Sequence, residues 1–192
     1  MKNILASLLI FSVLVFSCKQ EKKPAGKPYI SVPSLVSAQV KQVDTSLYVI
    51  RKIVTIDSTS DTSFVKREDF AAEAKDFLEL PDLADPKISK NYKQDSAIYD
   101  EFLNRVIITY KPADENALIR KEEILLTPSL LEGDHFHSIL VSTFKQDRNG
   151  SVQKEMLWRM DKSFQVVTTE QAPGQPEKIR TVKITWNEDE NQ

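Results

Sequence analysis

The best candidate for metal chemistry in this sequence is the segment EGDHFHS, residues 132–138. His135 and His137 are two residues apart, so on a β-strand both side chains point to the same side of the sheet. Asp134 adds a carboxylate directly before them. A zinc ion held here would need a further ligand from elsewhere in the chain, and the protein would then be a metal-dependent hydrolase. In the alternative, both histidines lie on the solvent face of a strand.

Other catalytic and cofactor-binding motifs are absent from the sequence. It has no GxSxG nucleophile motif, no HExxH zinc motif, and neither the GxGxxG nor the GxxxxGK[ST] pattern of nucleotide-binding loops. The chain contains only four glycines, whereas a phosphate-binding loop normally uses several together. Its net charge of −2, with both signs mixed along the chain, provides no basic surface for nucleic acid. The sequence therefore favours a non-enzymatic protein without a cofactor.

The only cysteine, Cys18, marks a sharp change in composition. Lys2 is followed by an apolar stretch over residues 4–16, and the small residue Ser17 precedes the cysteine. This is the three-part layout of an export signal. The apolar stretch of thirteen residues is too short to span a membrane, which takes roughly 20 residues. One cysteine also excludes an intramolecular disulfide, so packing must stabilise the fold.

The segment VFSC, residues 15–18, resembles the lipobox at which bacterial lipoproteins are cleaved, with Phe16 in place of the usual small or branched residue. The resemblance implies a signal peptide over 1–17 and a mature N-terminus at Cys18 that carries acyl chains such as palmitate. Two or three such chains anchor a protein stably to a membrane. The charged residues that follow resemble the start of Bacteroidota lipoproteins. This implies a protein of the cell envelope, held at the outer membrane and facing the periplasm or the cell surface.

Two short segments, DST (57–59) and DSA (95–97), resemble the O-glycosylation sequon of exported Bacteroidota proteins. The resemblance implies Ser58 and Ser96 as modification sites. Both serines lie in segments that the sequence predicts to be exposed loops, where such a modification is accessible.

The elements that position these residues begin with a tether. Residues 18–32 combine proline and glycine with lysines and have no periodicity, which predicts a flexible, solvated segment. Apolar residues then recur every three or four positions and predict a helix over 33–54. They are Val36, Val40, Val43, Leu47, Ile50 and Val54. The rival interpretation is a strand over 47–56, where β-branched residues crowd together.

A polar break over 57–63 separates this element from a second predicted helix over 63–80. In that helix Phe70, Ala74 and Phe77 share one face, and Pro81 ends it. Residues 81–97 hold two prolines and many charges and predict a long loop.

From Tyr99 onward the pattern changes to a period of two, which predicts strands. The strands are expected over 101–111, 118–127, 136–146, 151–160, 163–171 and 178–187. Short turns at 147–150 and 160–163 and a longer one at 171–177 join neighbours into an antiparallel meander. Helices followed by strands predict an α+β fold, in which an N-terminal helical pair packs on one face of an antiparallel meander sheet of about six strands. The expected domain is a single one over 33–192.

The aromatic residues of the meander bear on what the domain binds. They are Trp158, Trp186, Tyr110, Phe144 and Phe164. On a curved sheet they would line a concave face that carries an apolar ligand or a lipid, unless the helical pair fills that face, which we expect. The sequence thus predicts a lipid-anchored binding module whose partner is another envelope protein, a glycan or an apolar ligand.

Overall fold

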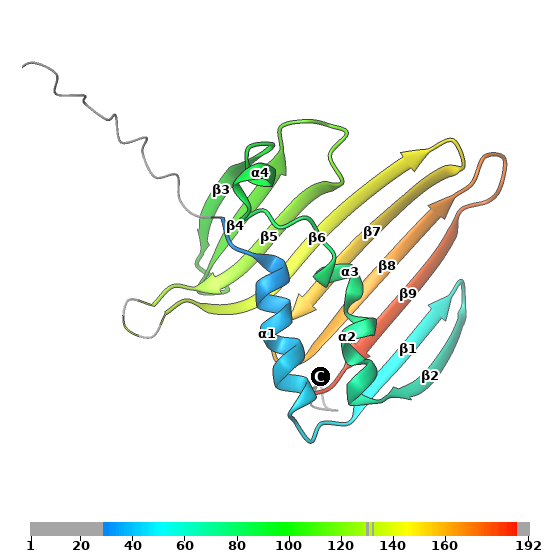
Figure 1. Cartoon of the computed structure of the whole chain (residues 1–192), viewed down its shortest axis with the longest axis horizontal. Coiled ribbons are helices and arrows are strands. Elements are labelled where there is room, and N and C mark those ends of the chain that lie inside the picture. The colour runs from blue at the N-terminus through cyan, green and yellow to red at the C-terminus, as the bar shows by residue number, and fades with distance from the viewer. Residues whose placement is uncertain (1–28, 130, 132, 188–192) are drawn as a thin grey trace, which may run out of the picture.

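A computed structural model describes residues 29–129, 131 and 133–187. Its main feature is one antiparallel sheet with nine strands in the described residues, in the order β2-β1-β9-β8-β7-β6-β5-β4-β3. The helix α1 (Val32–Asp44) and a chain of short helical turns lie across one face of this sheet (Figure 1). The α+β class and the antiparallel sheet predicted from the sequence are therefore confirmed in outline, while the number of strands and the form of the helices differ.

The elements have the following bounds. The strands are β1 (Ile50–Ile56), β2 (Thr59–Val65), β3 (Tyr92–Asp100), β4 (Arg105–Pro112), β5 (Ile119–Thr127), β6 (His135–Asp147), β7 (Gly150–Arg159), β8 (Ser163–Gln171) and β9 (Lys178–Thr185). The short helical turns are η1 (Arg67–Asp69), α2 (Phe70–Glu73), α3 (Lys75–Leu78) and α4 (Pro86–Ser89).

The six predicted strands correspond to β4 to β9, and each of them pairs with its neighbour in sequence. The sheet is larger because β3 extends it at one edge and the β1–β2 hairpin extends it at the other. The hairpin joins through β1, which pairs antiparallel with the C-terminal strand β9. Strands from the two ends of the domain thus become neighbours.

The helix predicted over 33–54 ends much earlier, at Asp44, and residues 50–56 form β1. Ser31 caps the helix by accepting a hydrogen bond from the Ser34 amide at 3.2 Å. The strand interpretation is correct for the second half, because β1 is paired on both sides. Ladder hydrogen bonds on two sides outweigh an apolar spacing that also fits a helix.

Two segments predicted as irregular are strands at the edges of the sheet. The polar break at 57–63 holds only a two-residue turn at Asp57 and Ser58, after which β2 begins. The predicted loop over 81–97 contains the first six of the nine residues of β3. Both predictions are wrong for the same reason: an edge strand that exposes most of its side chains shows no apolar alternation.

The second predicted helix is broken into the one-turn elements η1, α2 and α3. Its predicted inner face is nevertheless confirmed, since Phe70, Ala74 and Phe77 are all fully buried. Two ion pairs hold this segment on the sheet. Lys52 of β1 contacts Glu73 at 2.6 Å, and Lys154 of β7 contacts Asp76 at 2.7 Å.

Aromatic side chains fill the space between the short helices and the sheet. Trp158 and Phe164 stack with ring centroids 4.9 Å apart. The rings of Phe70 and Phe77 meet Trp158 from the helical side, edge to face. Trp186 completes this cluster. The helix-side face of the sheet is therefore packed, as expected from the sequence.

Two of the five predicted aromatics lie elsewhere. Tyr110 packs against Tyr29, with ring centroids 4.9 Å apart, near one edge of the sheet. Phe144 follows the buried Thr143 and lies on the opposite side of β6, half-buried under the Arg120 guanidinium. Of the five aromatic residues, Phe144 therefore lies on the face away from the core, whereas Tyr110 is buried within it.

The turn between β6 and β7 depends on Gly150. Its φ of 136° is rarely adopted by L-residues, and a Cβ at this position would meet the Gln171 carbonyl oxygen of β8. We expect Gly150→Ala to destabilise the domain by about 2 kcal/mol, because backbone strain and overpacking add. Gly174→Ala is the matched control: φ is also positive there, but no atom lies within 4 Å of the added Cβ. Equal losses in urea unfolding for the two variants would contradict the clash.

Candidate functional site

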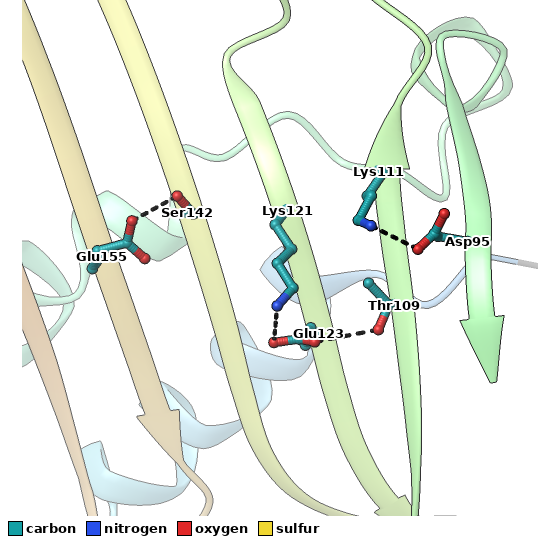
Figure 2. Close-up of polar contacts among 7 residues, drawn as sticks. All are labelled: Asp95, Thr109, Lys111, Lys121, Glu123, Ser142 and Glu155. Carbon is teal, nitrogen blue, oxygen red and sulfur yellow. Dashed lines mark hydrogen bonds and ion pairs between the residues drawn. The ribbon is translucent and has the colours of Figure 1, made fainter. Parts of the chain in front are cut away.

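The face of the sheet opposite α1, α2 and α3 is here called the open face. It carries charged and polar side chains (Figure 2) beside apolar ones such as Ile98, Ile107 and Leu140. Strand alternation places Thr109, Glu123, Ser142 and Glu155 on this face, since their neighbours in sequence lie on the helix side. Lys121 lies there too, because it pairs with Ser142 across β5 and β6.

A groove of about 580 Å³ runs along the open face near the β3 edge of the sheet. Its apolar surface comes mainly from Ile98 and Ile107, which pair across β3 and β4. The aromatic residues Tyr99 and Phe102 stand at one end of it. The groove is therefore built from three neighbouring strands, β3, β4 and β5, and from the β3–β4 hairpin.

Two ion pairs lie in this groove (Figure 2). The Lys111 ammonium is 2.8 Å from an Asp95 carboxylate oxygen, across β4 and β3. The hydrogen bond from Lys111, together with its positive charge, lowers the pKa of Asp95 below its usual value. In the second pair Lys121 lies 2.9 Å from Glu123, two residues along β5. The Thr109 hydroxyl also donates to Glu123, at 3.3 Å.

A second hollow of about 280 Å³ continues the groove toward the centre of the sheet. Lys121 and Glu123 line both hollows, so the two adjoin. In the second one the Ser142 hydroxyl donates to a Glu155 oxygen at 2.7 Å, and the Gln153 amide donates to the same oxygen at 2.9 Å. Apolar surface beside them comes from Leu140 and Leu157.

This arrangement suits binding better than catalysis. The ammonium and carboxylate groups are already paired, and the Ser142 hydroxyl donates to a carboxylate. Nucleophilic catalysis by a serine needs a general base aligned to remove its proton, usually a histidine. Neither histidine is among the residues that line the two hollows. The groove offers matched charges of both signs beside apolar surface.

The two histidines lie at the start of β6 and line neither hollow. Their rings are in contact, with centroids 4.7 Å apart, in agreement with the predicted same-side geometry. His137 shares a 2.8 Å hydrogen bond with the Thr127 hydroxyl. Burial lowers the pKa of His137, and the positive charges of Arg105 and His135 lower it further.

The predicted third member of that cluster, Asp134, accepts a hydrogen bond from the Ser129 amide at 3.4 Å. Over the ranges that the structure covers, no group of three or more histidine, cysteine, aspartate or glutamate side chains is placed to hold a metal ion. A metal site at His135 and His137 therefore stays a prediction.

The serines of the predicted sequons have different surroundings. Ser58 is exposed in the β1–β2 turn, as expected. Ser96 lies within β3, half-buried and on the wall of the groove, so the prediction of an exposed loop is wrong there. Glycosylation of either serine stays a prediction. Cys18 and the signal peptide over 1–17 lie outside the described residues.

The last residues of the predicted tether belong to the folded domain. The Tyr29 hydroxyl donates to the Tyr92 carbonyl at 2.7 Å, and the Ser31 hydroxyl donates to Asp82 at 2.8 Å. The domain therefore begins a few residues earlier than predicted, beside the start of β3.

One acidic side chain of the described residues, Glu122, is buried in the core. Glu122 of β5 points to the core side of the sheet with 1% of its surface exposed, and its Oε1 has no hydrogen-bond partner in the structure. Burial and the negative charge of Asp82 raise its pKa from 4.5 to about 8. The sequence holds a signal for it, since Glu122 alternates with the core residues Ile124 and Leu126. The burial of Glu122 was not among the predictions from the sequence.

Comparison with known proteins identifies no relative. No protein-family model matches this chain, and no match was found among curated proteins or solved structures. Within the part of the chain that the structure describes, no helix combines the length and the apolarity needed to cross a membrane.

Proposed function

We propose that this protein is a membrane-tethered lipoprotein of the cell envelope whose sheet domain binds a polypeptide segment of another envelope protein. The groove on the open face carries the proposal, because it places ion pairs and apolar surface side by side along an edge of the sheet. The domain acts as a binding module and not as an enzyme.

The tether is supported by the N-terminal sequence. The lipobox-like segment VFSC ends at Cys18, and the lysine-rich segment that follows connects it to the domain. The contacts of Tyr29 and Ser31 fix the point at which this segment joins the fold. The number of residues between Cys18 and Tyr29 then limits the distance between the domain and the membrane.

An extended peptide fits the groove for three reasons. First, among the described strands β3 pairs with β4 alone, so its outer edge can add a strand from a partner through main-chain hydrogen bonds. Second, the groove carries charged groups that can pair with opposite charges on the peptide. They are the cations Lys111 and Lys121 and the anions Asp95 and Glu123. Third, apolar side chains at alternate peptide positions can contact Ile98 and Ile107.

The packing of the other face favours this surface over an enclosed apolar site. Trp158, Phe164, Phe70 and Phe77 occupy the space between sheet and helices. A lipid carried there would have to displace them, whereas the groove is open to solvent.

The proposal is tested by site-specific photo-cross-linking in the cells that produce the protein. A photoreactive phenylalanine analogue at Ile98, which is 60% exposed on the groove wall, should cross-link to a peptide of a second envelope protein. Lys121→Glu should lower the yield roughly fivefold, because it replaces an attractive pair with two like charges beside Glu123 and removes about 1 kcal/mol of binding.

The matched control carries the analogue at Ile179 of β9, which is 45% exposed and far from the groove in the strand order. It should give no cross-link to the same peptide. Equal cross-linking at Ile179, or cross-links only to lipid or glycan, would contradict a peptide-binding groove.

A further inference from the structure

The ends of the strands divide the surface of the sheet into two borders. Antiparallel pairing brings the ends of β3, β5, β7 and β9 to the same border as the starts of β4, β6, β8 and β1. We call this border the loop end. In Figure 1 it runs along the lower left side of the sheet, and the loops 45–49 and 101–104 extend from it, as do the described residues 128–129, 131 and 133–134 between β5 and β6.

The most exposed hydrophobic side chains of the described residues all lie at the loop end. Five large ones are at least 70% exposed, and they are Leu47, Val49, Phe64, Phe102 and Leu131. They come from four segments that are distant in sequence. A single exposed leucine is ordinary on a protein surface, but a set confined to one border indicates an interaction surface.

The opposite border has a different character. Its turns are polar at Asp57 and Ser58 and at Arg148 and Asn149. The exposed hydrophobic residues near it, such as Leu118 and Ile179, are only 41% and 45% exposed. The highly exposed hydrophobic residues therefore distinguish one end of the sheet from the other, and not one face from the other.

The spacing of the apolar residues favours a lipid surface over a protein partner. Leu47 and Val49 precede β1, whereas Phe102 follows β3, and seven strand-to-strand steps separate these two strands. At about 4.8 Å per step the apolar tips are spread over about 34 Å. Separate tips at that spacing do not form one continuous protein-binding patch, but a fluid bilayer can admit each of them independently.

The remaining chain can reach such an orientation. Tyr29 is held at the start of β3, and the nine residues of β3 span about 30 Å to the loop end. The eleven residues from Cys18 to Tyr29 can extend up to about 40 Å. An acylated Cys18 can therefore lie in the same membrane plane as the loop end.

We propose that the loop end docks on the bilayer to which Cys18 is attached, with Leu47, Phe102 and Leu131 entering the interfacial region. The inference rests on the proposed lipid tether and adds a second, reversible contact to it. Apolar loop tips at the boundary between headgroups and acyl chains gain from leaving water, and the aromatic ring of Phe102 suits that depth.

The test uses the full chain, purified with its lipid and reconstituted into vesicles of phosphatidylethanolamine and phosphatidylglycerol. Leu47, Phe102 or Leu131 is replaced by cysteine and labelled with an environment-sensitive fluorophore, while acylated Cys18 stays unreactive. Control labels are placed at Leu118 and Ile179 on the opposite border. The loop-end labels should show a blue-shifted emission maximum and quenching by nitroxide lipids, and the control labels should show neither.

Palmitate labelling of the same preparations separates the two proposals. An acylated chain whose five labels behave alike, either all in water or all quenched, overturns the docking and leaves the tether standing. A chain without palmitate that still shows the loop-end shift on vesicles keeps the docking and refutes the tether. A chain with neither signal refutes both.

Discussion

Replacing Trp158 by alanine is expected to destabilise the domain by about 3–5 kcal/mol. Trp158 has no exposed surface and contacts rings from both sides of the core: Phe164 of the neighbouring strand stacks on it, and Phe70 and Phe77 meet it from the helical segment. Its indole N–H has no hydrogen-bond partner in the structure, so the side chain contributes through packing alone. Truncation leaves a cavity that these rigid rings cannot fill.

The loss can be measured by urea unfolding, with the emission of Trp186 as the remaining tryptophan signal. Leu140→Ala is the control, because Leu140 lies on the adjacent strand β6 but faces the open side of the sheet, 37% exposed. It should cost about 1 kcal/mol or less. A loss below about 1 kcal/mol for Trp158→Ala would mean that the core is not organised around this ring.

The second large effect is a pH dependence that originates at Glu122. Its pKa is 4.5 in an ordinary setting and about 8 in the fold, because burial and the nearby Asp82 disfavour the charged form. Between these values the folded chain keeps a proton that the unfolded chain releases, so stability falls as pH rises. The contribution is complete below about pH 4.5 and is lost by about pH 8. The full drop is up to about 5 kcal/mol.

Glu122→Gln should remove this slope, since the amide cannot ionise. Near pH 8 the variant should be more stable than the wild type, whereas near pH 4.5 the two should be similar. Glu123→Gln is the matched control, because Glu123 is the next residue but lies on the open face in an ion pair with Lys121. Free energies of unfolding from urea titrations at several pH values provide the comparison. If the stability of Glu122→Gln depends on pH as steeply as that of the wild type, another group is responsible for the titration.

The sequence predicts the central strands well because each has one buried and one open face. In β6 the core residues Ile139 and Val141 alternate with Leu140 and Ser142, which makes a period of two visible. The turn at Gly150 separates β6 from β7 equally clearly. The alternation of buried and open residues within such a strand is enough to predict it, without information about the neighbouring strands.

The edges of the sheet could not be predicted in the same way. In β2 six of seven residues are exposed, so both faces of the strand look alike in sequence. In β1 the apolar spacing fits a helix, and the strand forms because β9 and β2 pair with it. These outcomes depend on partners that are distant along the chain.

The candidate site was predicted only in part. The spacing of His135 and His137 predicts that both point to the same side of a strand, and their rings are in contact. The groove was not predicted. Its ion pair connects Lys111 of β4 with Asp95, which lies in a segment that the sequence predicts to be a loop. Side chains of either sign are frequent on protein surfaces, and only the register of β3 on β4 brings these two together.

The pairing of β1 with β9 has a consequence for how this protein is made. The strand that completes the sheet, β9, follows all the other described strands in sequence, and it must insert between β1 and β8. Until then the early hairpin has no neighbour, and Phe70 lacks the ring of Trp186, which follows β9. Long-range pairings of this kind fold slowly. The described sheet thus cannot close before β9 has been synthesised, so the earlier strands remain in an incomplete sheet until then.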